Sequence, residues 1–293
     1  MKQPLSLWLE GTRPNTLIAI LSPVAIGTII TWGHRQWSLV TWLATLCSAL
    51  LIQIGTNFAN DYLDAIKGAD TADRRGPRRL ASSNLVSIRA LKIATALCFG
   101  LAALVAVYLT LVGGYPIAIL AIVAISCGFF YTGGPYPLAY LGLGDLFVFV
   151  FFGPVATAGT AYLQTGVFSS LAALAGIAPG LLATALLTAN NLRDEASDRR
   201  AGKKTIPVRF GKKVGQVEYL CCLVGAALTP VLLVTVTTVH TPLLLASAFL
   251  LFARPAFTIL AGQADLSLLL PETAKLLAAY TLLFLFTWLL ASP

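Results

Sequence analysis

Long apolar stretches alternate with short polar segments along almost the whole chain. A helix needs roughly 20 consecutive apolar residues to cross the hydrocarbon core of a bilayer. Nine stretches of about this length occur, at 15–32, 38–58, 87–112, 115–131, 144–165, 168–191, 214–237, 241–262 and 273–291. They predict an all-α integral membrane protein with nine transmembrane helices. Because these spans use most of the chain, we expect residues 1–293 to form a single intramembrane domain.

The composition agrees with this pattern. Hydrophobic residues make up 57% of the chain and charged residues only 11%, whereas a soluble domain carries about 25% charged residues. The five cysteines fall inside or at the edges of the predicted spans and show no metal-binding spacing. His34 and His240 are far apart, which argues against a zinc site or a His-based catalytic triad.

The distribution of positive charge predicts the orientation in the membrane. If residues 1–14 are cytoplasmic, every Lys and Arg except Arg35 falls in or beside a cytoplasmic segment. Cytoplasmic loops of membrane proteins carry an excess of Lys and Arg. We therefore expect a multi-pass protein of the cell inner (plasma) membrane, with its N-terminus in the cytoplasm and its C-terminus outside. The net charge of +8 is explained by these loops and does not indicate nucleic-acid binding.

Acidic residues gather in two segments on the same predicted side. An Asp-rich segment at 57–73 follows the second apolar stretch, and another at 190–204 follows the sixth. If the preceding helices continue, residues spaced at i, i+3, i+4 and i+7 share one helix face. This spacing holds for Asn57, Asn60, Asp61 and Asp64, and in part for Asn191, Asp194 and Asp198.

Carboxylates and carboxamides on two facing helix ends suit Mg²⁺, which is typically bound by a few carboxylates together with substrate phosphates. Neighbouring Arg and Lys side chains would hold the phosphate oxygens. Two solvated loops are the simpler alternative, but carboxylates at the end of a span are costly without a partner. A transporter is a weaker alternative, because its ionisable groups would lie near the bilayer midplane, where the predicted spans carry almost no charge.

The two Asp-rich segments resemble the paired motifs of the UbiA superfamily of intramembrane prenyltransferases. Asn60-Asp61-x-x-Asp64 is similar to the first motif and Asp194-x-x-x-Asp198 to the core of the second. The resemblance runs from about residue 8 to about residue 215. It includes Arg13-Pro14, Tyr131-Thr132-Gly133-Gly134 and Gly142-Leu143-Gly144-Asp145.

Further strings are similar to the 1,4-dihydroxy-2-naphthoate polyprenyltransferase branch, including Lys67-Gly68-x-Asp70, Arg75-Gly76-Pro77-x-Arg79-Leu80 and Asn190-Asn191-x-Arg193-Asp194. Ser83-Asn84 and the loop 135–140, which lacks a basic residue, depart from the branch pattern. The branch implies transfer of a polyprenyl group from its diphosphate to the naphthoate, with decarboxylation, giving demethylmenaquinol for menaquinone biosynthesis. Prenylation of 4-hydroxybenzoate or homogentisate is the alternative.

The resemblance also implies a fold and a set of residue roles. The helices would surround a central cavity that is capped on the cytoplasmic side. Mg²⁺ would be the cofactor, polyprenyl diphosphate and 1,4-dihydroxy-2-naphthoate the substrates, and membrane lipid the surroundings, with no nucleic acid and no obligate protein partner. The metal ligands would be Asn60, Asp61, Asp64, Asp194 and Asp198, of which the last three, together with Asp145, are the expected catalytic residues. The diphosphate would be held by Arg13, Lys67, Arg193, Lys203, Lys204 and Arg209.

Tyr62, Tyr131 and Asn191 would contact the prenyl group or the aromatic acceptor. Each of these roles has a structural alternative. Either tyrosine would also suit core packing, and Asn191 would also suit a backbone hydrogen bond. Asp145 is expected either to orient or deprotonate a phenol, or to cap the N-terminus of the fifth span.

Overall fold

The computed structural model describes residues 4–68, 78–237 and 241–291, and these residues form helices and connecting turns without any strand. The first half of the chain contains α1 (Leu5–Gly11), α2 (Pro14–Ile30), α3 (Leu39–Ile66), α4 (Ile88–Gly113), α5 (Tyr115–Phe130), α6 (Leu138–Leu141) and α7 (Gly144–Val150). A π-helical turn, η1 (Phe151–Val155), joins α7 to α8 (Ala156–Thr165). The remainder contains α9 (Ser170–Ala175), α10 (Ile177–Arg200), α11 (Ile206–Phe210), α12 (Lys212–Val236), the 3₁₀ helix η2 (Thr241–Phe252), α13 (Arg254–Leu260), the short η3 (Leu266–Leu268) and α14 (Leu269–Ala291).

Each predicted apolar stretch contains helical structure, and this confirms the all-helical prediction. Six helices of the described chain are long and apolar enough to cross a membrane, or up to eight if two bent pairs each count as one span. The protein is therefore a multi-pass membrane protein. The helix α5 has 16 residues and is shorter than the others, so the count of nine spans stays a prediction.

Side-chain caps and helix breakers set several helix boundaries. The hydroxyl groups of Ser38, Ser87 and Ser169 accept hydrogen bonds from backbone N–H groups in the first turns of α3, α4 and α9. Gly114, at a φ of 71°, ends α4 and leads into α5. These local signals place the turns between the apolar stretches.

Two of the long apolar stretches are not straight helices. The helices α1 and α2 meet at an angle of 58°, where Arg13 has a φ of 54° and Pro14 begins α2. In the second case, Gly153 has a non-helical conformation inside η1. A Cβ atom on Gly153 would lie 2.6 Å from the carbonyl oxygen of Gly176. Glycine therefore permits the broken span to pack closely against the start of α10.

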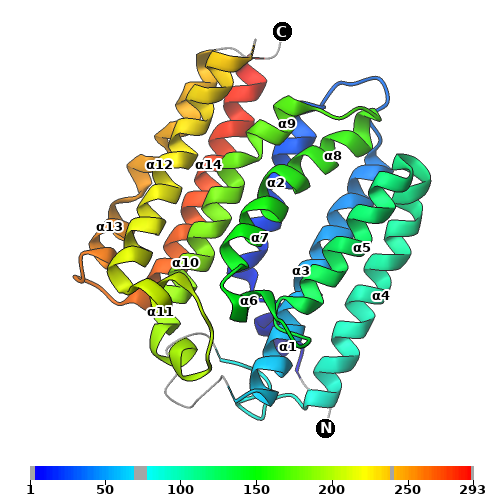
Figure 1. Ribbon diagram of the computed structural model, residues 1–293. Coiled ribbons are helices and arrows are strands. Elements are labelled where there is room, and N and C mark those ends of the chain that lie inside the picture. Colours follow the sequence, from blue (N-terminus) through cyan, green and yellow to red (C-terminus); the bar gives the residue numbers. More distant parts are fainter. Residues whose placement is uncertain (1–3, 69–77, 238–240, 292–293) are drawn as a thin grey trace.

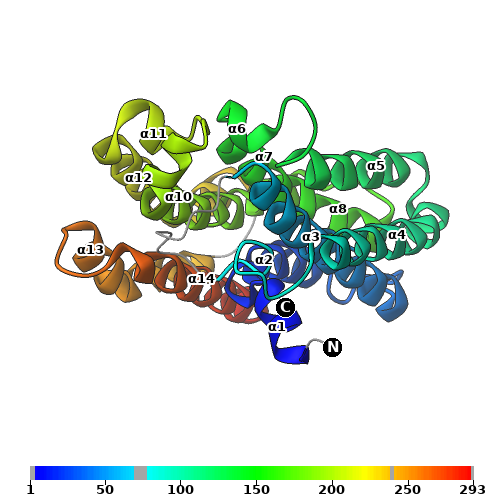
Figure 2. The ribbon, with the colours of Figure 1, turned by 90° about the horizontal axis from the view of Figure 1, so that it is seen from below.

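The helices form a bundle in which α10 is the most buried candidate span (Figures 1 and 2). Its neighbours include α2, α7, α12 and α14. The largest hydrophobic cluster fills the space between α10, α12, η2 and α14. Two buried hydroxyl pairs join helices there, Tyr219 with Thr273 at 2.7 Å and Ser22 with Thr281 at 2.6 Å. Such polar contacts replace the hydrogen bonds that lipid cannot supply.

The predicted Asp-rich segments meet at one end of the bundle. The helices α3 and α10 continue beyond the predicted span ends, to Ile66 and Arg200, and both finish at the end where α6 and α11 also lie (Figure 1). We call this the polar end of the bundle. The C-terminal part of α14 lies at the opposite end (Figure 1).

Candidate active site

An elongated cavity of about 550 Å³ opens among α2, α3, α4, α5, α7, α8 and α10. Its lining includes Asp64 at the polar end and Thr45 deep within the bundle. At about 1.5 Å per helical residue, these two positions on α3 lie about 28 Å apart. The far part is apolar and includes Leu109, Ile117 and Leu163. The polar end gathers the charged and amide side chains Arg13, Asn60, Asp64, Asn191, Arg193, Asp194, Asp198 and Lys203.

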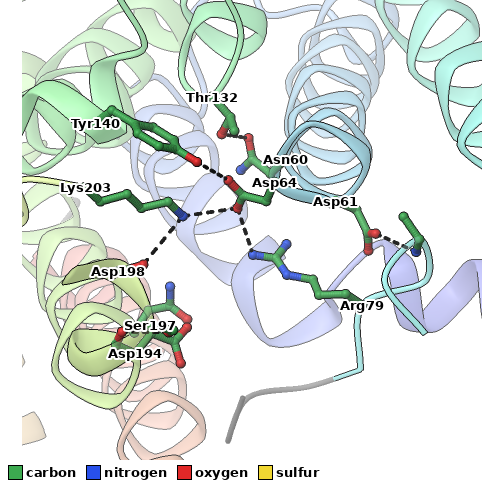
Figure 3. A network of polar contacts seen from close by, with 12 residues as sticks. Asn60, Asp61, Asp64, Arg79, Thr132, Tyr140, Asp194, Ser197, Asp198 and Lys203 are labelled. Atoms are coloured by element: carbon green, nitrogen blue, oxygen red, sulfur yellow. Dashed lines mark hydrogen bonds and ion pairs between the residues drawn. The ribbon is translucent and has the colours of Figure 1, made fainter. Parts of the chain in front are cut away.

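Asp64 is the most connected acidic residue of the first motif. Its carboxylate is buried and lies 3.2 Å from Nζ of Lys203 and 3.4 Å from Nη2 of Arg79. The Oη atom of Tyr140 donates a hydrogen bond to its other oxygen at 3.1 Å. Figure 3 shows these three side chains converging on Asp64 from separate parts of the chain. The positive charges of Arg79 and Lys203 and the hydrogen bond from Tyr140 compensate for burying the carboxylate.

Asn60 lies one turn earlier on α3 and also lines the cavity. Its Oδ1 atom accepts a hydrogen bond from the hydroxyl of Thr132 at 2.5 Å. The ammonium of Lys67 donates to the backbone oxygen of the same threonine at 2.6 Å. Loss of hydration lowers the pKa of Lys67, the Asp64 carboxylate opposes this shift, and the Lys203 ammonium adds to it. The segment after α5 is thus fixed to the end of α3.

The second motif is organised by an arginine of the same helix. Two nitrogens of Arg193 each lie 2.7 Å from an oxygen of Asp194, forming a two-pronged ion pair. Arg193 also donates a hydrogen bond to Asn190. Asp198 follows one turn later, with an oxygen 3.6 Å from Nζ of Lys203. The prediction that Asn191, Asp194 and Asp198 face one side is confirmed, because all three line the cavity.

Asp145 and Tyr131 line the cavity from the neighbouring elements. The Oδ1 atom of Asp145 is buried and has no hydrogen-bond partner. Asp145 lies in the first turn of α7, and no side chain caps that helix, so the alternative role as an N-cap is wrong. A Cβ atom on Gly144 would lie 3.0 Å from Oη of Tyr131, which places the phenol beside the start of α7.

Two predicted site residues of α3 face away from the cavity. Successive residues of a helix are rotated by about 100°, so Asp61 lies well to one side of Asn60 and Asp64. Both oxygens of Asp61 accept backbone hydrogen bonds, from Leu80 at 3.0 Å and Ala81 at 2.9 Å. Tyr62 belongs to a buried hydrophobic cluster outside the cavity. Asp61 and Tyr62 therefore support the fold, and neither is part of the proposed site.

Three of the basic residues expected at the diphosphate also lie outside the cavity lining. Lys67 and Lys204 instead border a shallower neighbouring pocket, together with Tyr140. Arg209 is exposed and lies 5.1 Å from the ring of Phe210. Lys67 and Lys204 lie just beyond helix ends and Arg209 lies in the short helix α11, so sequence spacing along a long helix does not specify their direction. The motif positions Asp70, Asp73 and 75–77 lie outside the described residues.

Sequence reasoning missed two side chains that contact Asp64. Arg79 is buried at 7% exposure. In the sequence it stood out only as one residue of the string 75–80, to which no individual role was assigned. Tyr140 is one of two tyrosines in the segment 135–140 and belongs to no recognised motif. Its ring also lies 4.3 Å from Nζ of Lys67 and 5.3 Å from Nζ of Lys203. A tyrosine outside a motif carries no sequence signal for such a position.

The acidic residues suit a metal that shares its coordination with a ligand. Within the described chain, no group of three or more His, Cys, Asp or Glu side chains is close enough to hold an ion alone. Mg²⁺ commonly binds through one or two carboxylates together with substrate phosphates and water. Asn60 and Asp64 on α3 and Asp194 and Asp198 on α10 offer such oxygens around the same cavity end. The donor set therefore fits Mg²⁺ bound together with a diphosphate.

Comparisons with known proteins identify close similarity over most of the chain. Residues 20–266 match the model of the UbiA prenyltransferase family. The sequence is 39% identical over 225 residues to the 1,4-dihydroxy-2-naphthoate octaprenyltransferase of Escherichia coli (strain K12), covering 75% of this chain and 73% of that protein. It is 40% identical over 230 residues to the enzyme of the same name from Mycobacterium tuberculosis, covering 77% of each.

Solved structures share the fold at low sequence identity. A UbiA homolog from Aeropyrum pernix K1 has a TM-score of 0.68 at 16% identity, covering 91% of this chain and 96% of that one. A UbiA homolog from Archaeoglobus fulgidus bound to DMAPP and Mg²⁺ has a TM-score of 0.63 at 14% identity, covering 94% and 98%. At this level of identity the similarity establishes the arrangement of helices.

Proposed function

The chain belongs to the UbiA prenyltransferase family, and we infer that it transfers a polyprenyl group from polyprenyl diphosphate to 1,4-dihydroxy-2-naphthoate. The acceptor loses its carboxylate as carbon dioxide, and the product is demethylmenaquinol, an intermediate of menaquinone biosynthesis. The observation that carries this assignment is the identity of 39% and 40% to two enzymes of this name across about three quarters of the chain.

The polar end of the cavity supplies the groups that a departing diphosphate requires. Asn60, Asp64, Asp194 and Asp198 would hold Mg²⁺, which would neutralise the charge that develops on the diphosphate. Arg13, Arg193 and Lys203 line the same end and position the diphosphate oxygens by charge-assisted hydrogen bonds. Cleavage of the bond between the diphosphate and the first prenyl carbon leaves an allylic cation, which faces the apolar part of the cavity.

The acceptor binds beside Asp145, Tyr131 and Asn191, which line the cavity next to the polar end. The unpaired Oδ1 atom of Asp145 accepts a hydrogen bond or a proton from a naphthol hydroxyl. The ring carbon that carries the carboxylate attacks the prenyl cation. Loss of carbon dioxide then restores the aromatic ring, and the electron pair of the broken bond returns to it.

The apolar length of the cavity accommodates the prenyl tail. It reaches Leu109, Ile117 and Leu163 near the opposite end of the bundle. Walls of this kind also exclude water, which would otherwise capture the allylic cation. Tyr131, which lines the cavity next to the polar end, offers an aromatic ring that stabilises positive charge on the allylic cation.

The proposed topology is a single domain with nine spans in the plasma membrane, an N-terminus in the cytoplasm and a C-terminus outside. In this arrangement α5 and the two bent pairs each cross the bilayer. The polar end then faces the cytoplasm, with α6 and α11 as parts of a cap above the cavity. The charge distribution between loops supports this orientation, and α1 and the end of α14 lie at opposite ends of the bundle (Figure 1).

The decisive experiment is a competition assay with purified protein in lipid nanodiscs. The assay contains Mg²⁺, an all-trans polyprenyl diphosphate, and equal amounts of 1,4-dihydroxy-2-naphthoate and 4-hydroxybenzoate, and products are identified by mass spectrometry. We expect a prenylated naphthoquinol that lacks the carboxylate. Prenylated hydroxybenzoate as the sole product would overturn the acceptor assignment, and the absence of both products would overturn the proposed reaction.

A further inference from the structure

Gln53 is a carboxamide in the middle of α3 that lines the cavity. It precedes Asn60 by seven positions and Asp64 by eleven. At about 100° of rotation per residue, these spacings place all three side chains within about 40° of one another around the helix. The face of α3 that carries two of the proposed metal ligands therefore continues inward along the cavity to Gln53.

The side chain of Gln53 makes no hydrogen bond to any residue that the structure describes. Thr56 and Thr45 line the same wall, but each hydroxyl donates to a backbone oxygen of its own helix, at 2.8 and 2.7 Å. A carboxamide carries two donor hydrogens and an acceptor oxygen, and leaving them unpaired among apolar walls is costly. Gln53 therefore offers hydrogen-bonding groups that suit a polar part of a ligand in the cavity.

The depth of Gln53 in the cavity follows from the rise of the helices. Oxygens of Asp64 and Asp198 lie 3.2 and 3.6 Å from the same atom, Nζ of Lys203, so these two carboxylates mark a similar level at the polar end. Eleven residues farther in, about 16 Å at 1.5 Å per residue, α3 reaches Gln53 and α10 reaches Leu187. Gln53 and Leu187 therefore lie at a similar depth.

Asp145 lies beside Leu187, on a different wall of the cavity from Gln53. A Cβ atom on Gly144 would lie 3.4 Å from Cδ2 of Leu187, and Asp145 is the next residue of α7. The hydroxyl of Thr184, one turn away on α10, lies 3.5 Å from the backbone oxygen of Asp145. At one depth the cavity thus carries the amide of Gln53 on α3 and the unpaired carboxylate oxygen of Asp145 on α7.

The proposed acceptor carries two hydroxyl groups at opposite positions of one ring. The first is adjacent to the ring carbon that bears the carboxylate. Removing the proton of this hydroxyl directs electron density to that carbon, so it is the hydroxyl that Asp145 serves. The second hydroxyl points away from Asp145 toward another wall. Binding pockets fix the orientation of a ligand through a few placed polar groups, and Gln53 provides such a group at the required depth.

We propose that Gln53 determines acceptor specificity: its amide binds the hydroxyl of 1,4-dihydroxy-2-naphthoate that lies opposite the one held by Asp145. The inference rests on the function proposed above and names a residue that selects the acceptor. An acceptor with a single hydroxyl, such as 4-hydroxybenzoate, leaves the amide unpaired, and a site built to pair with a hydroxyl disfavours a ligand that lacks it.

The test compares two ligands that differ only in the second hydroxyl. Prenyl transfer by the full-length protein in nanodiscs gives KM for 1,4-dihydroxy-2-naphthoate, and inhibition of the same reaction gives Ki for 1-hydroxy-2-naphthoate. Gln53→Met removes the amide and keeps an unbranched side chain of similar length. The matched control is Gln36→Met, which makes the same exchange at an exposed position before α3. Thermal unfolding of each variant verifies that it is folded.

In Gln53→Met, KM for the dihydroxy acid should rise by about three- to tenfold, because one hydrogen bond is lost. The value of kcat should stay within about twofold, since the bond is present in both the ground state and the transition state. Ki for 1-hydroxy-2-naphthoate should also stay within about twofold, because this ligand has no group for the amide. Gln36→Met should leave all three quantities unchanged.

An equal loss of affinity for both ligands would overturn the proposal, since it would indicate a general disturbance of the cavity. An unchanged KM in Gln53→Met would also overturn it. So would a wild-type protein that 1-hydroxy-2-naphthoate does not inhibit, because one missing hydroxyl should weaken binding only about tenfold. Absence of any naphthoate prenylation by the wild-type protein would instead refute the proposed function, so the two failures are distinguishable.

Discussion

The Oη atom of Tyr140 lies 3.1 Å from Oδ1 of Asp64, so the short helix α6 donates a hydrogen bond to the last carboxylate of α3. The same ring lies near the ammonium groups of Lys67 and Lys203. Tyr140 therefore orients Asp64 from outside the cavity lining. A hydrogen bond to a charged group contributes about 1.5–3 kcal/mol, enough to matter for a metal ligand.

Tyr140→Phe removes this hydrogen bond and keeps the ring. We expect turnover to fall by about tenfold, because Asp64 loses one of the contacts that fix its carboxylate. Initial rates of prenyl transfer in nanodiscs measure the effect. Tyr136→Phe is the control, because Tyr136 is 76% exposed. Equal rates for the two variants would show that Tyr140 does not orient Asp64.

Asp64→Ala and Asp198→Ala each remove a proposed metal ligand. We expect turnover to fall at least about a hundredfold, while the protein remains folded in the membrane. Rates are measured with Mg²⁺ at saturating concentration, and again after chelation with EDTA, which should stop the wild-type enzyme reversibly. A rate close to wild type in either variant would show that the substituted residue is not needed as a metal ligand.

Asp61→Ala should behave differently from Asp64→Ala, although the two positions belong to the same motif. The substitution leaves the N–H groups of Leu80 and Ala81 without their carboxylate acceptors. Each buried unsatisfied group costs about 1–3 kcal/mol, so the melting temperature should fall. Turnover per folded molecule should remain well above that of Asp64→Ala. A stable but inactive Asp61→Ala protein would instead indicate that Asp61 is a metal ligand.

Asp145→Asn retains the shape of the side chain and removes its charge. We expect kcat to fall by about a hundredfold with little change in KM for the prenyl diphosphate, because Asp145 lies on α7, away from the two Asp-rich motifs. Steady-state kinetics with each substrate varied in turn separate these quantities. A variant that changes only the KM of the diphosphate would contradict the proposed role toward the acceptor.

Gly153→Ala tests the close contact between the broken span and α10. The added methyl group would lie 2.6 Å from the carbonyl oxygen of Gly176 and 2.7 Å from Cα of Gly180. Overpacking of this kind costs about 1–3 kcal/mol, so the thermal unfolding temperature should decrease. Gly100→Ala is the control, since nothing lies within 4 Å of its added methyl group and alanine favours helix. A Gly153→Ala protein as stable as this control would disprove the contact.

The sequence predicted the structure best where long apolar stretches determine it. Each apolar stretch formed helix, since in lipid a backbone must satisfy its own hydrogen bonds. The breaks were not predicted, because Gly153 and the bend at Arg13 lie inside uniformly apolar or short segments. Spacing predicted a shared face for Asp61 and Asp64, but Asp64 lines the cavity whereas Asp61 binds the backbone of a loop, because positions i and i+3 differ by about 60° on a helix. A rotation of this size is enough to direct Asp64 toward the cavity and Asp61 toward a loop.

Tyr140 and Arg79 show a second limit. Their contacts with Asp64 depend on how the loops after α3 and α5 fold back over the end of the bundle, and loop direction is set by tertiary packing. Sequence spacing describes a face of one helix, whereas these contacts join segments 15 and 76 residues apart along the chain. The same reason explains why Lys67 and Lys204 border a different pocket from the one expected.

The shortness of α5 has a consequence for the lipid around the enzyme. Its 16 residues extend about 24 Å, less than the hydrocarbon thickness of about 30 Å, and Ile119 and Ile122 on its surface are exposed. If α5 crosses the bilayer as proposed, the lipid beside it must compress to match its length. Since α5 also borders the cavity, the acyl chains of the host membrane act on the same wall that encloses the prenyl tail. In the proposed topology, bilayer thickness thereby becomes a physical variable of catalysis, alongside substrate and metal concentration.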